Sequence, residues 1–169
     1  VQVLPLRMVR AQIDSVISDF RVTAIKTGML ATRAIVRLVA AQAAALSDRP
    51  WVVDPVMIAS SGAALLHPDA QRSVRDLLLP HAQVLTPNVP EAEALLGRRI
   101  QRQSELERAA DDLRQLGPRA VLLKGGHMPG REVVDVYCDA QGLTLYKTPR
   151  RKLKGHGTGC TLASLVAAR

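Results

Sequence analysis

The stretch VTAIKTGMLATRAIVRLVAAQAAALSDRPWVVD, residues 22–54, joins two short apolar runs through a helical pattern. The first run, Val22–Lys26, has the length of a strand. Apolar residues then recur at helical spacing between Ile35 and Leu46, after Thr32, whose hydroxyl is suited to cap a helix. Trp51–Asp54 is the second short run. The stretch therefore predicts a strand, a loop, a helix and another strand.

The same alternation continues on both sides of this stretch. Strands that alternate with helices of this length are joined by right-handed crossovers in a mainly parallel sheet. The predicted fold class is α/β, with three layers αβα in which helices cover both faces of the sheet. The further elements expected are helices over Leu6–Phe20, after Pro68, over Pro90–Gly97, and from a capping box at Ser104–Glu107 to Gly117, and strands over Val84–Thr86 and Ala120–Lys124.

After Gly125-Gly126 the pattern changes to two adjacent strands. The apolar runs Val133–Tyr137 and Leu143–Tyr146 flank the turn Asp139–Gly142, and this arrangement is typical of a β-hairpin. We expect the hairpin at an edge of the sheet. No internal repeat or low-complexity tract divides the chain, so residues 1–169 are expected to form a single domain.

The composition is typical of a globular domain. The chain has 169 residues, of which 47% are apolar, enough for one buried core. Its net charge is +8, but only 2% of its residues are aromatic, which leaves little for stacking on nucleic-acid bases. The basic run Lys147–Lys154 is interpreted as a solvated loop. A phosphate-bearing small substrate accounts for the charge equally well, and we expect no nucleic-acid partner.

The sequence gives no sign of a membrane span or a secreted scaffold. No run reaches the roughly 18 apolar residues of a membrane helix, and the start lacks the layout of a signal peptide. Two cysteines, Cys138 and Cys160, are too few for a disulfide framework. We expect a cytoplasmic protein without membrane contact. Because it begins at Val1 without methionine and stops at Arg169 inside a helical pattern, we also expect it to be cut at both ends.

Polar residues follow four of the predicted strands at the point where each ends. They are Lys26–Met29, Asp54–Met57, Thr86–Asn88 with Glu91, and Lys124–His127. In an open parallel sheet the ligand crevice lies beyond the carboxyl ends of the strands. Any one of these segments alone is compatible with ordinary loop chemistry, but together they predict a binding site on one rim.

The segment Gly155–Cys160 opens a run of helical composition, Thr161–Val166. Glycines at a helix start let backbone N–H groups converge on an anion, which the helix dipole also favours. The segment lacks the Gly-Lys-Ser/Thr ending of a Walker A loop and the layout of a dinucleotide fold, and a tight connection is the structural alternative. Cys160 lies in the first turn, where it could act as a base or as a polar wall, or pack as a small buried thiol.

These motifs occur together in one family. The chain resembles the hydroxymethylpyrimidine/phosphomethylpyrimidine kinases of the ribokinase superfamily over nearly all of its length, and the resemblance implies a ribokinase-like fold. The segments that carry it are Lys26–Leu30, Val52–Gly62, Leu85–Leu96, Val121–His127 and His156–Ser164.

The resemblance implies an anion hole for the transferred phosphoryl group. It would consist of Gly157, Thr158 and Gly159 with the backbone N–H of Cys160. Cys160 stands where sugar kinases of the superfamily have a catalytic aspartate. It is thus the implied catalytic residue, which either accepts the proton of the substrate hydroxymethyl group or orders that group for attack.

The resemblance also implies ATP and Mg²⁺ as cofactors. Asn88 and Lys124 match nucleotide-phosphate contacts, and Glu91 with Asp54 nearby matches the magnesium side of the site, where few carboxylates suffice. The pair Met29 and Val56 matches positions that line the pyrimidine pocket, although a core role is an open alternative for both.

The implied activity is the ATP-dependent phosphorylation of 4-amino-5-hydroxymethyl-2-methylpyrimidine and then of its monophosphate, in thiamine biosynthesis, by a homodimer. A pyridoxal or pyridoxine kinase of the same group is one alternative. A non-catalytic remnant that binds pyrimidine phosphates is another, because the strand and glycine-containing substrate loop with which family members begin do not precede Val1.

Overall fold

A computed structural model describes residues 2–58, 64–151 and 157–168. Its centre is a six-stranded sheet in which spatial order follows chain order, β1 to β6. The first four strands are parallel, and β5 and β6 are antiparallel additions at one edge. The strands are β1 (Ile25–Thr27), β2 (Trp51–Val53), β3 (Val84–Leu85), β4 (Ala120–Leu123), β5 (Glu132–Asp139) and β6 (Gly142–Pro149).

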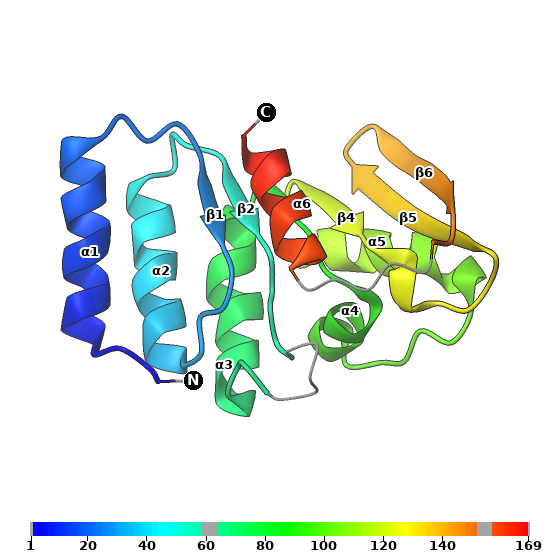
Figure 1. The fold of residues 1–169 in the computed structure, drawn as a ribbon, viewed down its shortest axis with the longest axis horizontal. Helices are drawn as coiled ribbons and strands as arrows, with labels where there is room; N and C mark the ends of the chain where they lie inside the picture. The colour runs from blue at the N-terminus through cyan, green and yellow to red at the C-terminus, as the bar shows by residue number, and fades with distance from the viewer. Residues whose placement is uncertain (1, 59–63, 152–156, 169) are drawn as a thin grey trace.

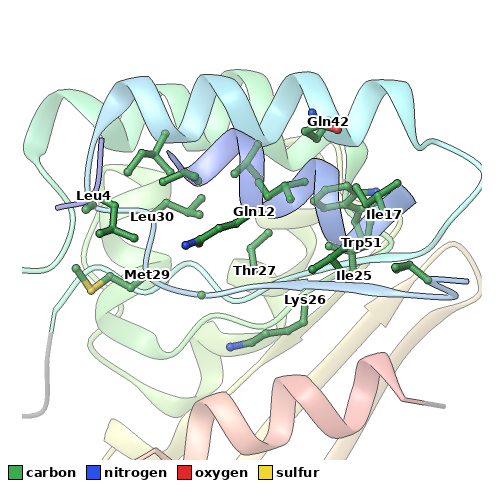
Figure 2. Close-up of a pocket in the computed structure, with 18 of the residues that line it drawn as sticks. Leu4, Gln12, Ile17, Ile25, Lys26, Thr27, Met29, Leu30, Gln42 and Trp51 are labelled. Carbon is green, nitrogen blue, oxygen red and sulfur yellow. The ribbon is translucent and has the colours of Figure 1, made fainter. Parts of the chain in front are cut away.

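Helices lie on both sides of this sheet, as predicted. Helix α6 crosses one face over β1 and β2, whereas α1 and α2 lie on the other side of β1 (Figures 1 and 2). Helix α5 packs against β4 and β5. The α/β class and the three-layer arrangement are therefore confirmed. The helices are α1 (Leu6–Asp19), α2 (Arg33–Ala45), α3 (Pro68–Ser73), α4 (Val89–Leu96), α5 (Leu106–Arg114) and α6 (Thr158–Ala167).

Burial explains why the central elements form where they do. All of β2 is buried, as expected for a strand covered on both faces. Helix α2 presents the apolar stripe Val36, Val39, Ala40 and Ala43 to the core. The Thr32 hydroxyl accepts a hydrogen bond from the Ile35 amide at 3.4 Å, so the predicted cap is present.

The hairpin has the predicted turn, since Asp139 pairs with Gly142 across it. Gly142 has a φ of +134°, a conformation that glycine adopts without a steric penalty. Alternate residues of β5 are buried, and α5 packs on this strand, while every residue of β6 is exposed. The hairpin thus forms the edge of the sheet, as expected.

Two local predictions are wrong in detail. The first strand occupies Ile25–Thr27 and not Val22–Lys26, because only these residues pair with β2. The predicted capping box at Ser104–Glu107 is replaced by a 3-10 turn over Gln103–Glu105, after which α5 begins. The Glu105 carboxylate accepts from the Gln101 amide at 2.8 Å, so the earlier glutamate closes this turn. The loop predicted through residues 60–62 lies outside the described residues.

Candidate functional site

The polar segments that follow the parallel strands meet at one rim of the sheet, as the sequence predicted. The register pairs Thr27 with Val53, and Val53 with Leu85. The residue after each strand is therefore brought to the same level. The Lys124 amide donates to the Pro87 carbonyl at 2.8 Å, which ties the end of β4 to the segment after β3.

Asp54 lies at the centre of this rim and is only 3% exposed. Lys124 Nζ lies 3.4 Å from its Oδ1, and Lys26 Nζ lies 3.5 Å from its Oδ2. A buried carboxylate needs such partners, because losing water costs far more for a charged group than for a neutral one. Two ammonium groups thus share the Asp54 carboxylate at the rim. Lys26 was not among the predicted site residues, although it belongs to a predicted rim segment.

Asn88 and Glu91 hold each other at the start of α4. Glu91 Oε2 accepts from the Asn88 amide at 2.8 Å, and Asn88 Oδ1 accepts from the Glu91 amide at 2.9 Å. This reciprocal pair is a capping box. The spacing of an asparagine and a glutamate three residues later could have revealed it. The cap uses the Asn88 side-chain oxygen, which leaves the NH₂ group of this side chain for a ligand.

Glu91 is 6% exposed, and burial raises its pKa from 4.5 to about 7. The Asn88 amide and the Lys124 ammonium act in the opposite direction, while the Asp54 charge adds to the rise. A carboxyl with this pKa changes its charge near neutral pH. A bound cation would favour its ionised form.

Glu91→Gln is expected to remove a pH dependence of stability. In metal-free buffer the unfolded chain releases this proton near pH 4.5 and the folded protein near pH 7. Between these values the folded state holds the extra proton, so rising pH favours unfolding by up to about 3 kcal/mol. Urea denaturation from pH 4.5 to 8 should show Glu91→Gln gaining stability relative to the wild type as pH rises. The exposed Glu107→Gln is the control, and parallel curves for both variants would contradict the prediction.

The first turn of α6 lies next to Lys124. Gly157 has a φ of +83° and precedes the helix, which begins at Thr158. No side chain in the described part of the chain caps this end, so the first amides of α6 are available to an anion. A Cβ built on Gly159 would lie 3.1 Å from Lys124 Nζ, which shows how closely the ammonium approaches this turn.

The two cysteines differ in environment. Cys160 is exposed in the first turn of α6, whereas Cys138 is buried in β5. The alternative that Cys160 packs as a buried thiol is therefore wrong, because α6 turns this position toward solvent. Burial raises the pKa of the Cys138 thiol, so this group stays neutral and unreactive. Gly155 and His156, which precede the α6 turn, lie outside the described residues.

The loop after Lys124 is held by Asp135 of β5 and by Arg150, which directly follows β6, and neither was among the predicted site residues. The Gly125 amide donates to Asp135 Oδ1 at 2.8 Å. The Arg150 guanidinium donates to the carbonyls of Gly126 at 2.8 Å, of Gly130 at 2.9 Å, and of Met128. Arg150 is therefore not merely part of a solvated basic run. Asp135 and Arg150 thus fix the loop that follows Lys124.

The predicted substrate residues lie on segments at the ends of β1 and β2. Met29 is 40% exposed and lines a mainly apolar cavity of about 640 Å³ between α1, α2 and β1 (Figure 2). Val56 does not line this cavity, but it shares a smaller void with Gly28 and Asp54. Figure 2 shows Thr27 and Lys26 on opposite sides of β1, with Lys26 directed toward α6.

The described residues contain no cluster of three or more histidine, cysteine or carboxylate side chains arranged to hold a metal ion. Among the same residues, no helix combines the length and apolarity needed to cross a bilayer. Asp54 and Glu91 are two carboxyl groups at this rim, and few carboxylates suffice for a magnesium ion that keeps water ligands.

Comparison with known sequences and structures adds independent findings. A family model described as phosphomethylpyrimidine kinase matches residues 1–169. The hydroxymethylpyrimidine/phosphomethylpyrimidine kinase of Streptomyces coelicolor is 46% identical over 165 residues, which cover 97% of this chain and 61% of the relative. A chloroplastic thiamine biosynthetic bifunctional enzyme of Arabidopsis thaliana is 43% identical, over 99% of this chain and 33% of the relative.

Solved structures agree on the fold. The ADP complex of Bacillus subtilis pyridoxal kinase has a TM-score of 0.89 at 30% identity, over 98% of this chain and 63% of its own. The phosphomethylpyrimidine kinase of Clostridium difficile has a TM-score of 0.81 at 33% identity, over 98% of this chain and 69% of its own. This chain thus spans about three fifths of the length of the Streptomyces relative and of the Bacillus structure.

Proposed function

The chain belongs to the phosphomethylpyrimidine kinase family, and from this premise we propose that it transfers the γ-phosphoryl group of ATP to 4-amino-5-hydroxymethyl-2-methylpyrimidine and to its monophosphate in thiamine biosynthesis. The observation that carries the proposal is the approach of Lys124 Nζ to the first turn of α6. A lysine and unpaired helix amides around one point suit a phosphoryl group in transfer, since this reaction asks the protein mainly for positioning and charge stabilisation.

In the proposed reaction the hydroxymethyl oxygen attacks the γ-phosphorus, the bond to the leaving ADP oxygen breaks, and the hydroxyl proton departs. Gly157, Thr158, Gly159 and the Cys160 amide would surround the phosphoryl oxygens. The Cys160 thiol stands in the same turn, from which it would contact the hydroxymethyl group. Met29 and Val56, after β1 and β2, would contact the pyrimidine ring.

Asn88, through its side-chain NH₂ group, and Lys124 would contact the nucleotide phosphates. The raised pKa of Glu91 fits a carboxylate that a divalent cation stabilises, so Glu91 would lie on the Mg²⁺ side of the site. Both oxygens of Asp54 face lysine ammonium groups, which makes Asp54 the weaker metal ligand of the two. When bound, Mg²⁺ would neutralise charge on the phosphate oxygens.

A coupled assay of ADP release tests the function directly. The purified protein should release ADP with the hydroxymethylpyrimidine and with its monophosphate, in proportion to phosphorylated product. If it phosphorylates neither compound, nor any pyridoxine-type alcohol, the proposal is wrong. Ligand binding by calorimetry without turnover would instead favour a non-catalytic binding module.

A pyridoxal kinase activity is the second candidate, favoured by the close superposition on the Bacillus subtilis pyridoxal kinase. The higher identity to hydroxymethylpyrimidine/phosphomethylpyrimidine kinases favours the pyrimidine. Competition between pyridoxal and the hydroxymethylpyrimidine for the same limiting protein separates the two, because the better substrate has the higher kcat/KM.

Cys160→Ala is expected to lower turnover at least about tenfold, as for the loss of a group that handles a proton in the transition state. Nucleotide affinity, measured by calorimetry with ADP, should change little, because the α6 amides come from the backbone. Cys160→Ser tests whether a hydroxyl supports part of the activity. Turnover of the alanine variant equal to the wild type would contradict a role for the Cys160 thiol in the reaction.

A further inference from the structure

Lys26 has no role in the reaction described above, yet it contacts the centre of the site. Its ammonium group lies 3.5 Å from Asp54 Oδ2, and its side chain is only 19% exposed. The side chain leaves β1 on the side of α6, opposite the Thr27 side chain (Figure 2). Lys26 therefore lies on the same side of β1 as the helix that opens the phosphoryl site.

Two ammonium groups share one buried carboxylate at the rim. One ammonium group suffices to neutralise the buried Asp54 carboxylate, and Lys124 Nζ lies 3.4 Å from it. An ammonium group has three N–H donors. Among the described residues, Asp54 provides the acidic partner of both lysines. Each ammonium group contacts a single carboxylate oxygen within 4 Å, so each keeps N–H donors for an anionic ligand.

The two lysines point to different loops. A Cβ on Gly28 would lie 3.2 Å from Lys26 Nζ, and a Cβ on Gly159 would lie 3.1 Å from Lys124 Nζ. Lys124 therefore borders the first turn of α6, while Lys26 borders the segment that leads to Met29. Because the two lysines contact the two oxygens of one carboxylate, they define two neighbouring anion positions.

We propose that Lys26 binds the phosphate that the monophosphate substrate already carries, while Lys124 contacts the phosphoryl group arriving from ATP. This inference rests on the proposed function. In the second reaction a phosphate oxygen of the substrate attacks the γ-phosphorus, the bond to ADP breaks, and a diphosphate forms. Its two adjacent phosphoryl groups match two adjacent ammonium groups. The alcohol substrate carries no such anion, so Lys26 determines specificity for the second phosphorylation.

Kinetics with both substrates test the proposal. Lys26→Met should lower kcat/KM for the monophosphate at least about tenfold more than for the alcohol, as expected for a lost charge-assisted hydrogen bond. Lys26→Arg keeps the charge and should recover a large part of this difference. Lys147→Met, on the exposed strand β6, is the matched control. Equal losses for both substrates in Lys26→Met would overturn the proposal.

A second measurement separates phosphate binding from simple neutralisation of Asp54. The measured quantity is the ratio of kcat/KM for the monophosphate to kcat/KM for the alcohol. If Lys26 only neutralises Asp54, this ratio should be the same in the double variant Lys26→Met/Asp54→Asn as in Asp54→Asn alone. That result would overturn the proposal. Calorimetry with inorganic pyrophosphate should show affinity at least about fivefold weaker in Lys26→Met than in Lys147→Met; equal affinity contradicts the proposal. The pyrophosphate result does not depend on turnover, so it tests Lys26 even if neither substrate is phosphorylated.

Discussion

Replacing Lys124 with methionine is expected to lower kcat about 10²–10³-fold, the usual cost of losing a fixed positive or hydrogen-bonding group that stabilises charge in a transition state. The ammonium group lies against the first turn of α6. A Cβ built on Gly159 in this turn would lie only 3.1 Å from Lys124 Nζ, closer than an ordinary van der Waals contact. Removing it leaves the helix amides without a neighbouring cation. Steady-state kinetics with ATP and the hydroxymethylpyrimidine measure the effect.

The fold should survive the substitution of Lys124, because Lys26 still pairs with Asp54. Circular dichroism and urea denaturation check this point, so that a loss of turnover is not confused with unfolding. Lys147→Met again serves as the control for removal of a lysine. A value of kcat within about threefold of the wild type would contradict a role for Lys124 in phosphoryl transfer.

Gly125→Ala is expected to destabilise the protein by at least about 3 kcal/mol, at or above the upper end for overpacking, because the clash is with backbone. A Cβ on Gly125 would lie 1.9 Å from the Val134 carbonyl oxygen and 3.3 Å from Leu106 Cδ1. The Gly125 amide also donates to Asp135. The loop cannot shift away without breaking this bond, so the strain falls on the contact between β4, β5 and α5.

The adjacent Gly126→Ala is the matched control. Among the residues that the structure describes, nothing lies within 4 Å of a Cβ at this position, and the expected change is within about 0.5 kcal/mol. Urea denaturation of both variants at one pH gives the comparison. Equal stabilities for the two variants would mean that β5 moves to accommodate the methyl group, and that the close approach of Gly125 to Val134 is not needed for folding.

Much of the site could be predicted because each part has a local signal. A polar residue after a short apolar run marks the end of a strand, and parallel strands bring their ends to one edge. Asp54 and Lys124 were therefore expected at one rim although they lie 70 positions apart. The glycine turn before α6 was expected from its composition alone.

Other parts of the site have no local signal. Arg150 lies in a basic run that resembles any solvated loop, and its hydrogen bonds to the carbonyls of Gly126, Met128 and Gly130 depend on how the hairpin folds back. The raised pKa of Glu91 depends on burial by neighbouring elements. Lys26 is one of several strand-end residues until its contact with Asp54 is seen.

The sequence by itself determined the α/β alternation, the Thr32 cap, the hairpin turn and which polar segments meet at the rim of the sheet. These features follow from periodicity, capping and turn chemistry, which act between residues a few positions apart. Only the tertiary structure decided that one buried carboxylate is shared by Lys26 and Lys124. It alone also decided that the hairpin holds the loop after β4, and that Cys160 faces solvent while Cys138 does not. The physical reason is that charge sharing and burial depend on the distances between side chains brought together by packing, which no local pattern encodes.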